Sequence, residues 1–166
     1  MPHLAHLNIA RMKVDWDDPE FRDFREALDP VNRSAEESPG YLWRLLSAED
    51  DSPEMVAFEN EGWLLNLTVW ASVEALQAFV RSPGHLAIMR RRAEWFAPVE
   101  VRVVLWWLDD GERPTFAEAM RRLERLRNEG PSQAAFDFRT PFPPLQGAQA
   151  PCYPPEPAEW AQGERA

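Results

Sequence analysis

Residues 63–70, WLLNLTVW, alternate between apolar and polar or aromatic side chains from Leu65 onward. Successive side chains of a β-strand point to opposite faces, so this period of two predicts a strand with two unlike faces. The apolar positions are Leu65, Leu67 and Val69, and the alternate positions are Asn66, Thr68 and Trp70. We expect the apolar face to pack on helices, and the other face to line a pocket or to meet a partner sheet.

Residues 3–10, 41–46 and 101–108 form three further predicted strands, and apolar residues at helical spacing separate them. A first helix is expected to begin at 17–19, Asp-Asp-Pro, because these residues supply capping carboxylates and a proline suited to a first turn. Pro30 lies inside the helical pattern and is expected to kink or end that helix. The connection 49–62 is predicted to be an acidic, exposed hairpin link.

Two more helices are predicted after the 63–70 strand, one from Ser72 to Val80 and one from about His85 to Phe96. A last helix is expected to begin at Thr115, which forms a capping-box pattern with Glu118. From residue 137 onward prolines are frequent, and this composition predicts an extended, partly disordered arm.

The predicted order of elements is β-α-β-β-α-β, with the second helical unit split and one helix added at the C-terminal side. This is the ferredoxin-like arrangement, an α+β fold with an antiparallel sheet and helices on one face. We therefore predict one ferredoxin-like domain over 1–136 and a proline-rich tail over 137–166. The uncovered face of such a sheet can meet a second sheet, which predicts a homodimeric α+β barrel.

Assigning faces strand by strand places a polar row on the sheet face predicted to be open. On the first strand Ala5, Leu7 and Ile9 are expected to meet the helices, which leaves His6 and Asn8 on the open face. The row then comprises His6, Asn8, Arg44, Asn66 and Thr68, with Trp70 and Trp106 beside it. Because an unpaired buried polar group costs roughly 1–3 kcal/mol, this row requires hydrogen bonds, water or a ligand. It is either a hydrogen-bonded dimer interface or a pocket that orients a polar group on a flat substrate.

Composition limits the possible partners of the chain. Its 166 residues are 45% hydrophobic and 28% charged, with a net charge of −10, which argues against general binding to nucleic acid or to anionic membranes. Cys152 is the single cysteine, so neither an intrachain disulfide nor a cysteine metal cluster is expected. We find neither a signal-peptide pattern nor a span of membrane length, and a cytoplasmic protein is the expectation. Eight tryptophans fit either core packing or a cavity for a flat, apolar ligand.

His85 begins a predicted helix after Pro83 and Gly84, and Arg92 follows two turns later on nearly the same side. A histidine at this position is either a capping or surface residue, or a general base or metal ligand above the cavity. No second histidine stands at i+4 and no carboxylate triad accompanies it, so no metal site is predicted.

Several segments resemble an uncharacterised bacterial family of the dimeric α+β barrel superfamily, whose members include antibiotic biosynthesis monooxygenases. The resemblance covers about residues 3–140 and rests on HLAHLNIAR, SPGYLWRL, LLNLTVWASVEALQAFV, GHLAIMRRRAEWF, VLWWLDDGERPTFAEAMRRLERLRNEGP and AFDF. It implies a homodimer with a cavity for a small apolar or aromatic ligand. Asn8 matches the first-strand asparagine of the haem-degrading members. Their distorting tryptophan and iron-ligating histidine, however, fall at Phe79 and Met89.

The resemblance and the polar row together favour a small monooxygenase or isomerase that acts on an apolar aromatic molecule in a cavity between two sheets. In that hypothesis His85 or His6 is the catalytic base, and the substrate is held by Asn8, Arg44, Asn66, Thr68, Trp70, Arg92 and Trp106. No cofactor is expected, and haem is kept as the alternative. The alternative hypotheses are a protein that binds a small molecule without catalysis and a domain whose open sheet serves only for dimerisation.

Overall fold

The computed structural model describes residues 1–46 and 52–145. Its sheet contains β1 (His3–Met12), β2 (Tyr41–Arg44), β3 (Trp63–Trp70), β4 (Phe96–Ala97) and β5 (Val103–Leu108). The strand order is β2-β3-β1, with β4 and β5 both antiparallel to β1 at its other edge. This order is the ferredoxin-like arrangement, so the predicted fold class is confirmed.

The helices are η1 (Pro19–Phe21), α1 (Arg22–Glu36), α2 (Pro53–Asn60), α3 (Val73–Val80), α4 (Pro83–Trp95) and α5 (Phe116–Glu129). Four of them begin at a hydroxyl side chain that accepts a backbone N–H of the first turn: Ser52, Ser72, Ser82 and Thr115. Such caps satisfy donors that have no partner within the helix. The split second helical unit and the added C-terminal helix are therefore as predicted.

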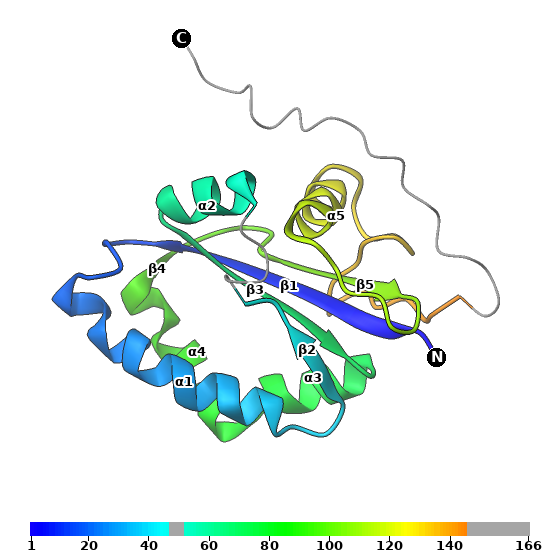
Figure 1. Ribbon diagram of the computed structural model, residues 1–166, viewed down its shortest axis with the longest axis horizontal. Helices are drawn as coiled ribbons and strands as arrows, with labels where there is room; N and C mark the ends of the chain where they lie inside the picture. The colour runs from blue at the N-terminus through cyan, green and yellow to red at the C-terminus, as the bar shows by residue number, and fades with distance from the viewer. Residues whose placement is uncertain (47–51, 146–166) are drawn as a thin grey trace, which may run out of the picture.

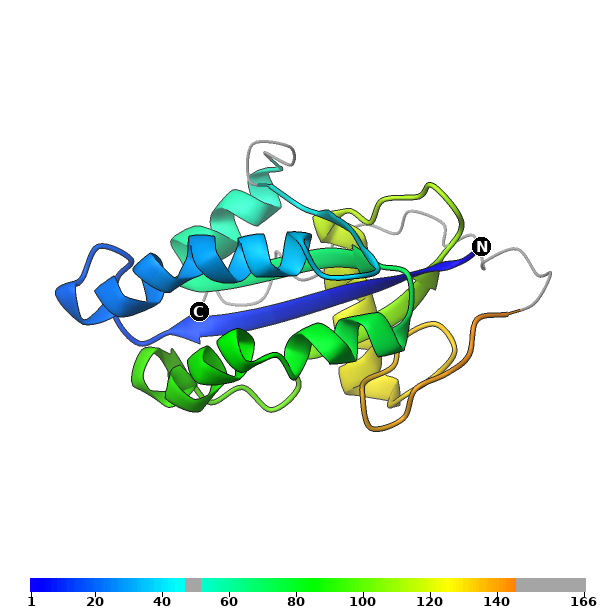
Figure 2. The ribbon, with the colours of Figure 1, turned by 90° about the horizontal axis from the view of Figure 1, so that it is seen from below.

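The sheet has helices on both sides. Figure 1 shows α1, α3 and α4 on one face and α2 and α5 on the other, and Figure 2 looks through α1, α3 and α4 onto the sheet. The added helix α5 packs its apolar stripe, Ala119, Leu123 and Leu126, onto the sheet. The sheet positions beneath it include Ala5, Leu7, Ile9, Leu67, Val69, Val104 and Trp106, each at most 2% exposed.

The predicted assignment of the two faces is therefore wrong. Ala5, Leu7 and Ile9 face the α2 and α5 side, whereas their neighbours on β1 face α1, α3 and α4. Alternation along a strand identifies its more apolar face but does not say which helices cover that face. The face expected to be open to a second sheet is covered by α1, α3 and α4, and the opposite face carries α2 and α5. The homodimer stays a prediction.

Three local predictions also need correction. α1 continues through Pro30, whose ring lies on the exposed side of the helix, where water can replace the missing backbone hydrogen bond. The connection expected to be a hairpin link contains α2, and Ser52 followed by Pro53 was its start signal; residues 49–51 lie outside the described part of the chain. The strand predicted from residue 101 begins at Val103 and is preceded by the two-residue β4.

The beginning of the C-terminal arm lies against the domain. Phe136 exchanges two backbone hydrogen bonds with Leu105, at 2.8 and 2.9 Å, and is fully buried. The carbonyl of Phe142 accepts a 2.8 Å hydrogen bond from the indole of Trp107. The aromatic residues of this segment thus extend the core cluster that also contains Leu4 and Trp70.

Candidate functional site

The predicted polar row exists and lies on the face of the sheet that α1, α3 and α4 cover. On β1 and β3, His6 stands opposite Thr68 and Asn8 stands opposite Asn66. Arg44 of β2 pairs with Thr68 from the other side. The sequence therefore predicted correctly that these side chains lie together. It assigned them to a face without helices, whereas they lie on the face that α1, α3 and α4 cover.

At the buried end of the polar row, Thr68 contacts both His6 and Trp70. Its hydroxyl oxygen accepts a 2.9 Å hydrogen bond from the indole N–H of Trp70 and lies 3.1 Å from Nδ1 of His6. His6 and Thr68 are only 6% and 4% exposed. The hydroxyl thereby joins an imidazole and an indole inside the core and satisfies both.

His6 is uncharged at neutral pH. Burial, reinforced by the nearby His85, lowers the pKa of His6 to about 3. An imidazole with so low a pKa is a weak base, but it remains a hydrogen-bonding group. His6 is thus better suited to orient a neighbour than to accept a proton from a substrate.

His85 lies in the first turn of α4, and its ring packs on Phe79 with 5.0 Å between centroids. Its Nδ1 donates a 2.9 Å hydrogen bond to the carbonyl of Val80, which holds the tautomer whose Nε2 carries the lone pair. Burial is the main cause that lowers the pKa of His85, so its neutral form predominates near pH 7. The side chain is half-buried and therefore retains access to a small molecule.

The two asparagines occupy the other end of the row. The Oδ1 of Asn8 is buried and has no hydrogen-bond partner among residues 1–46 and 52–145. Asn66, directly across from it, is exposed. The row therefore runs from a sealed end at Thr68 to an end that reaches solvent, and it holds one unsatisfied acceptor.

Two of the expected ligand contacts have other roles. Arg44 forms a 2.7 Å ion pair with Glu36 at the end of α1, so it joins β2 to that helix. Trp106 lies on the opposite face of the sheet, fully buried under α5 and 5.9 Å from the guanidinium of Arg122. Its proposed place beside the row was wrong, because Trp106 pairs with Ala5 and shares that residue's face.

Arg92 lies on α4 with its guanidinium 5.6 Å from the ring centre of Phe96. Burial, reinforced by the positive charge of Arg102, lowers the pKa of Arg92. Arg102 was not predicted as a site residue. The available signal was its position immediately before a buried strand, where an arginine without an acidic neighbour in the strand is unusual.

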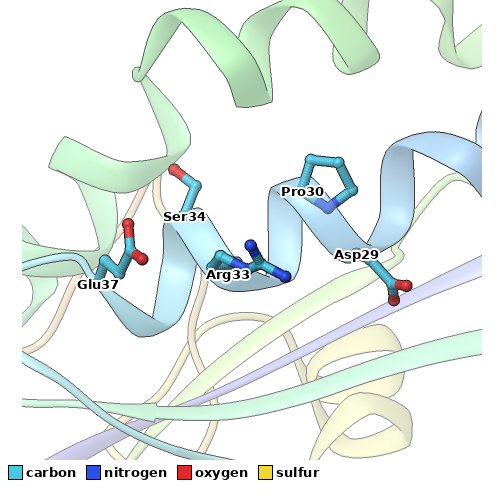
Figure 3. Close-up of a pocket in the computed structure, with 5 residues that line it drawn as sticks. All are labelled: Asp29, Pro30, Arg33, Ser34 and Glu37. Carbon is cyan, nitrogen blue, oxygen red and sulfur yellow. The ribbon is translucent and has the colours of Figure 1, made fainter.

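A separate hollow of about 410 Å³ lies along α1 (Figure 3). It is lined by Asp29, Pro30, Arg33 and Ser34 of that helix and by Glu37, which follows its last residue. All five side chains are exposed. None of the predicted site residues lines this hollow, so it is distinct from the polar row.

The described residues do not form a recognisable binding site for a metal ion or haem. Within the described ranges, no group of three or more histidine, cysteine, aspartate or glutamate side chains is placed to hold a metal ion. At the position where the haem degraders carry their iron ligand this chain has Met89, and His85 lies one turn earlier on the same helix. We therefore derive no step through haem.

The fold and the polar interior define an α+β protein of ferredoxin-like topology with helices on both faces of its sheet. The chain belongs to a family described as a domain of unknown function, DUF3291, whose model matches residues 3–151. No curated protein matches the sequence significantly. Among the described residues, no helix has the length and apolar character needed to cross a membrane.

Several solved structures are similar to this one. A conserved protein from Methanosarcina mazei Go1 has a TM-score of 0.48 at 15% identity, over 64% of this chain and 92% of that one. SnoaB, a cofactor-independent oxygenase from Streptomyces nogalater, has a TM-score of 0.43 at 14% identity, over 70% and 98% of the two chains. A protein of unknown function from Nitrosomonas europaea has a TM-score of 0.46 at 14% identity, over 69% and 97%. Similarities of this size do not transfer an activity to the present chain.

Proposed function

We propose that the protein binds a small, flat, apolar molecule between its sheet and helices α3 and α4, and that His85 removes a proton from it. The observation that carries this proposal is the state of His85. Its imidazole is neutral, its Nδ1 is held by Val80, and its Nε2 has no hydrogen-bond partner among the described residues. A general base requires this combination of a fixed ring and an available lone pair.

The remaining polar residues supply orientation rather than proton transfer. His6 and Thr68 are buried and hydrogen-bonded to each other, so they form a fixed, uncharged wall near His85. The amide groups of Asn8 and Asn66 provide further donors where negative charge develops on a substrate oxygen. The unsatisfied Oδ1 of Asn8 is itself an argument for a bound polar group, because buried acceptors are rarely left unpaired.

Proton abstraction is the first step shared by cofactor-free oxygenation and by isomerisation. In an oxygenation of a phenol, His85 takes the phenolic proton, and the phenolate then reacts with molecular oxygen. One oxygen atom is added to the ring, and the other leaves as water when a quinone forms. In an isomerisation, the proton returns to a different carbon. Non-catalytic binding of the same ligand remains the second candidate function, favoured by the absence of an acidic partner for His85 among the described residues.

The test uses 1-naphthol, a flat aromatic alcohol whose anion has its own absorption and fluorescence. At pH 7.5 the free alcohol is neutral, and we expect wild-type protein to bind it and display the naphtholate spectrum. His85→Gln is expected to retain binding and to lose the naphtholate signal, while His3→Gln, on the same protein but outside the row, keeps both. Binding of neutral naphthol by wild type would leave a ligand-binding protein without a base. A naphtholate signal that persists in His85→Gln would remove His85 from the role.

The protein as purified from cells provides the complementary observation. Native mass spectrometry with an absorbance spectrum would report its oligomeric state and any co-purified aromatic compound. The homodimer implied by the resemblance stays a prediction, and because α2 and α5 cover the sheet, we infer that its contact would involve other surfaces. Leu42, Leu46 and Val56 are among the exposed apolar side chains that could contribute to such a contact.

A further inference from the structure

We propose that Arg92 and Arg102 form a binding site for the carboxylate of the ligand, so that the substrates are apolar organic acids. This inference rests on the proposed function, because it names a chemical class for the molecule that would lie between the sheet and α4. It uses a pair of cations to which the proton-transfer proposal gives no role.

The two arginines are brought together at one edge of β1. β4 pairs with the end of β1 through Phe96 and Met12, and the backbone carbonyl of Arg102 accepts a 2.9 Å hydrogen bond from the N–H of Ile9. Arg92 is on the last turns of α4, directly before β4, with its guanidinium over the ring of Phe96. Two segments at this sheet edge thus bring the end of α4 and the backbone of Arg102 next to residues 9–12 of β1, and the two positive charges are near enough to interact.

Both guanidinium groups contain buried nitrogens that lack a partner. Nη2 of Arg92 and Nε of Arg102 are each sealed from solvent and form no hydrogen bond with any described residue. Neither arginine forms an ion pair within residues 1–46 and 52–145. Glu94 of α4 and Asp23 of the neighbouring α1 both pair with Arg91 instead, each at 2.8 Å.

Two like charges without an acid are unfavourable in a half-buried site. Each guanidinium loses hydration, and the two repel each other, which is the reason that the pKa of Arg92 is lowered. Buried charges in proteins are ordinarily paired. An anion between the two groups would offset both costs, and guanidinium groups are well suited to bind a carboxylate through two parallel hydrogen bonds.

The surroundings favour a carboxylate on an apolar body over a free inorganic anion. Phe96, under the Arg92 guanidinium, belongs to a cluster with Phe21, Phe24 and Trp95, whose rings lie within 5.6 Å of one another in successive pairs. Polyanions are also disfavoured by the net charge of −10. Phe21, Trp95 and Phe96 are at most 5% exposed, so a ligand ring would contact the partly buried residues packed against them, Met12, Phe24 and Leu64. An aromatic acid would then pair its carboxylate with the two guanidinium groups.

The experiment compares two probes with the same ring. Binding of 1-naphthoate and of 1-naphthol to the full chain is measured by calorimetry at fixed ionic strength, with sodium sulfate as a third, inorganic probe. We expect wild type to bind 1-naphthoate at least tenfold more tightly than 1-naphthol and to bind sulfate weakly. Arg92→Gln and Arg102→Gln should each lose this preference while still binding 1-naphthol. Arg90→Gln, which removes an exposed charge from the same helix, should keep it.

The ligand-free variants separate binding from structure. Removing one of two repelling cations should leave the melting temperature unchanged or raise it, whereas an arginine with a structural role would lower it. Equal affinity for the two naphthalene probes in wild type, or an unaltered preference in Arg92→Gln and Arg102→Gln, overturns the carboxylate site and leaves the proposed ligand pocket standing. Binding of neither naphthalene probe by wild type refutes both proposals together.

Discussion

Thr68 and His6 stand opposite each other on neighbouring strands, with the threonine hydroxyl oxygen 3.1 Å from the imidazole Nδ1. The same oxygen accepts the indole N–H of Trp70 at 2.9 Å. One hydroxyl therefore satisfies two large side chains that are otherwise enclosed by the core. Its removal leaves two polar groups without a partner and changes almost nothing in shape.

Thr68→Val is expected to lower the free energy of unfolding by roughly 2–6 kcal/mol, because each of the two groups left unpaired costs about 1–3 kcal/mol. Urea unfolding followed by tryptophan fluorescence would measure it. Thr68→Ser, which keeps the hydroxyl, should retain most of the stability. Equal destabilisation by the serine and valine variants would show that the methyl group, and not the hydrogen bonds, is what matters at this position.

The low pKa of His6 predicts how stability depends on pH. In the unfolded chain the imidazole takes up its proton near pH 6.5, but in the folded protein only near pH 3. The unfolded state therefore binds more protons between these values, so the free energy of unfolding should be constant above pH 6.5 and fall as the pH drops below it. The slope from His6 is at most about 1.4 kcal/mol per pH unit.

Unfolding between pH 7.5 and pH 5 isolates this effect, because most carboxylates titrate below that range. His6→Gln should reduce the slope, and His85→Gln should reduce it in the same direction, since burial lowers the pKa of His85 as well. His3→Gln controls for the loss of an imidazole outside the row. A wild-type stability that does not change between pH 6.5 and pH 5 would contradict a buried neutral His6.

The helix α5 should contribute strongly to stability, because it covers one whole face of the central strands. Leu123→Ala is expected to cost about 2–5 kcal/mol, the usual range for a leucine removed from a closed core. Arg121→Ala, on the exposed side of the same helix, is the matched control. A loss below about 1 kcal/mol for Leu123→Ala, measured by urea unfolding, would mean that α5 can leave the sheet and that a second copy can reach this face.

The order of the strands and the pairing of the polar row could be predicted because both follow from local periodicity. A period of two identified the unlike faces of β3, and ferredoxin-like order then placed His6 beside Thr68 and Asn8 beside Asn66. The helices that cover the polar row could not be predicted from this periodicity. Alternation ranks the two faces by polarity, and here the more apolar face was covered by the added helix α5, not by α1, α3 and α4.

The protonation states and ion-pair partners of the site residues were harder to predict from the sequence than their positions in the sheet. His6 and His85 were both candidates for a catalytic base, and only three-dimensional burial distinguishes the strongly depressed pKa of His6 from the milder case of His85. The role of Arg44 depends on Glu36, eight residues away and on another element. The Arg92 and Arg102 pair is formed by two segments that meet only at the sheet edge, so spacing in the sequence does not show it.

Asn66→Leu tests whether the exposed end of the row contacts the ligand. Because Asn66 is exposed, the change should alter stability by no more than about 0.5 kcal/mol. We expect it to abolish measurable binding of 1-naphthol, since the amide is lost and a larger apolar group fills the space. Gln77→Leu, which replaces an amide on α3 outside the row, is the control for an equivalent loss of polarity. Unchanged affinity in Asn66→Leu would exclude Asn66 from the site.

Two truncations should divide the C-terminal arm into a part that stabilises the domain and a part that does not. Removing residues 145–166 is expected to change the melting temperature little, because the described contacts of the arm end before that point. Removing residues 141–166 also deletes the Phe142 carbonyl that accepts from Trp107 and the Phe142 ring beside Phe136. The same truncation deletes the Pro143 carbonyl that accepts from the Gln133 side chain. It should lower stability by about 2–3 kcal/mol, from two lost hydrogen bonds and one lost aromatic contact. Scanning calorimetry of both proteins measures the difference, and a large drop already in the shorter truncation would show that residues beyond 144 hold the fold together.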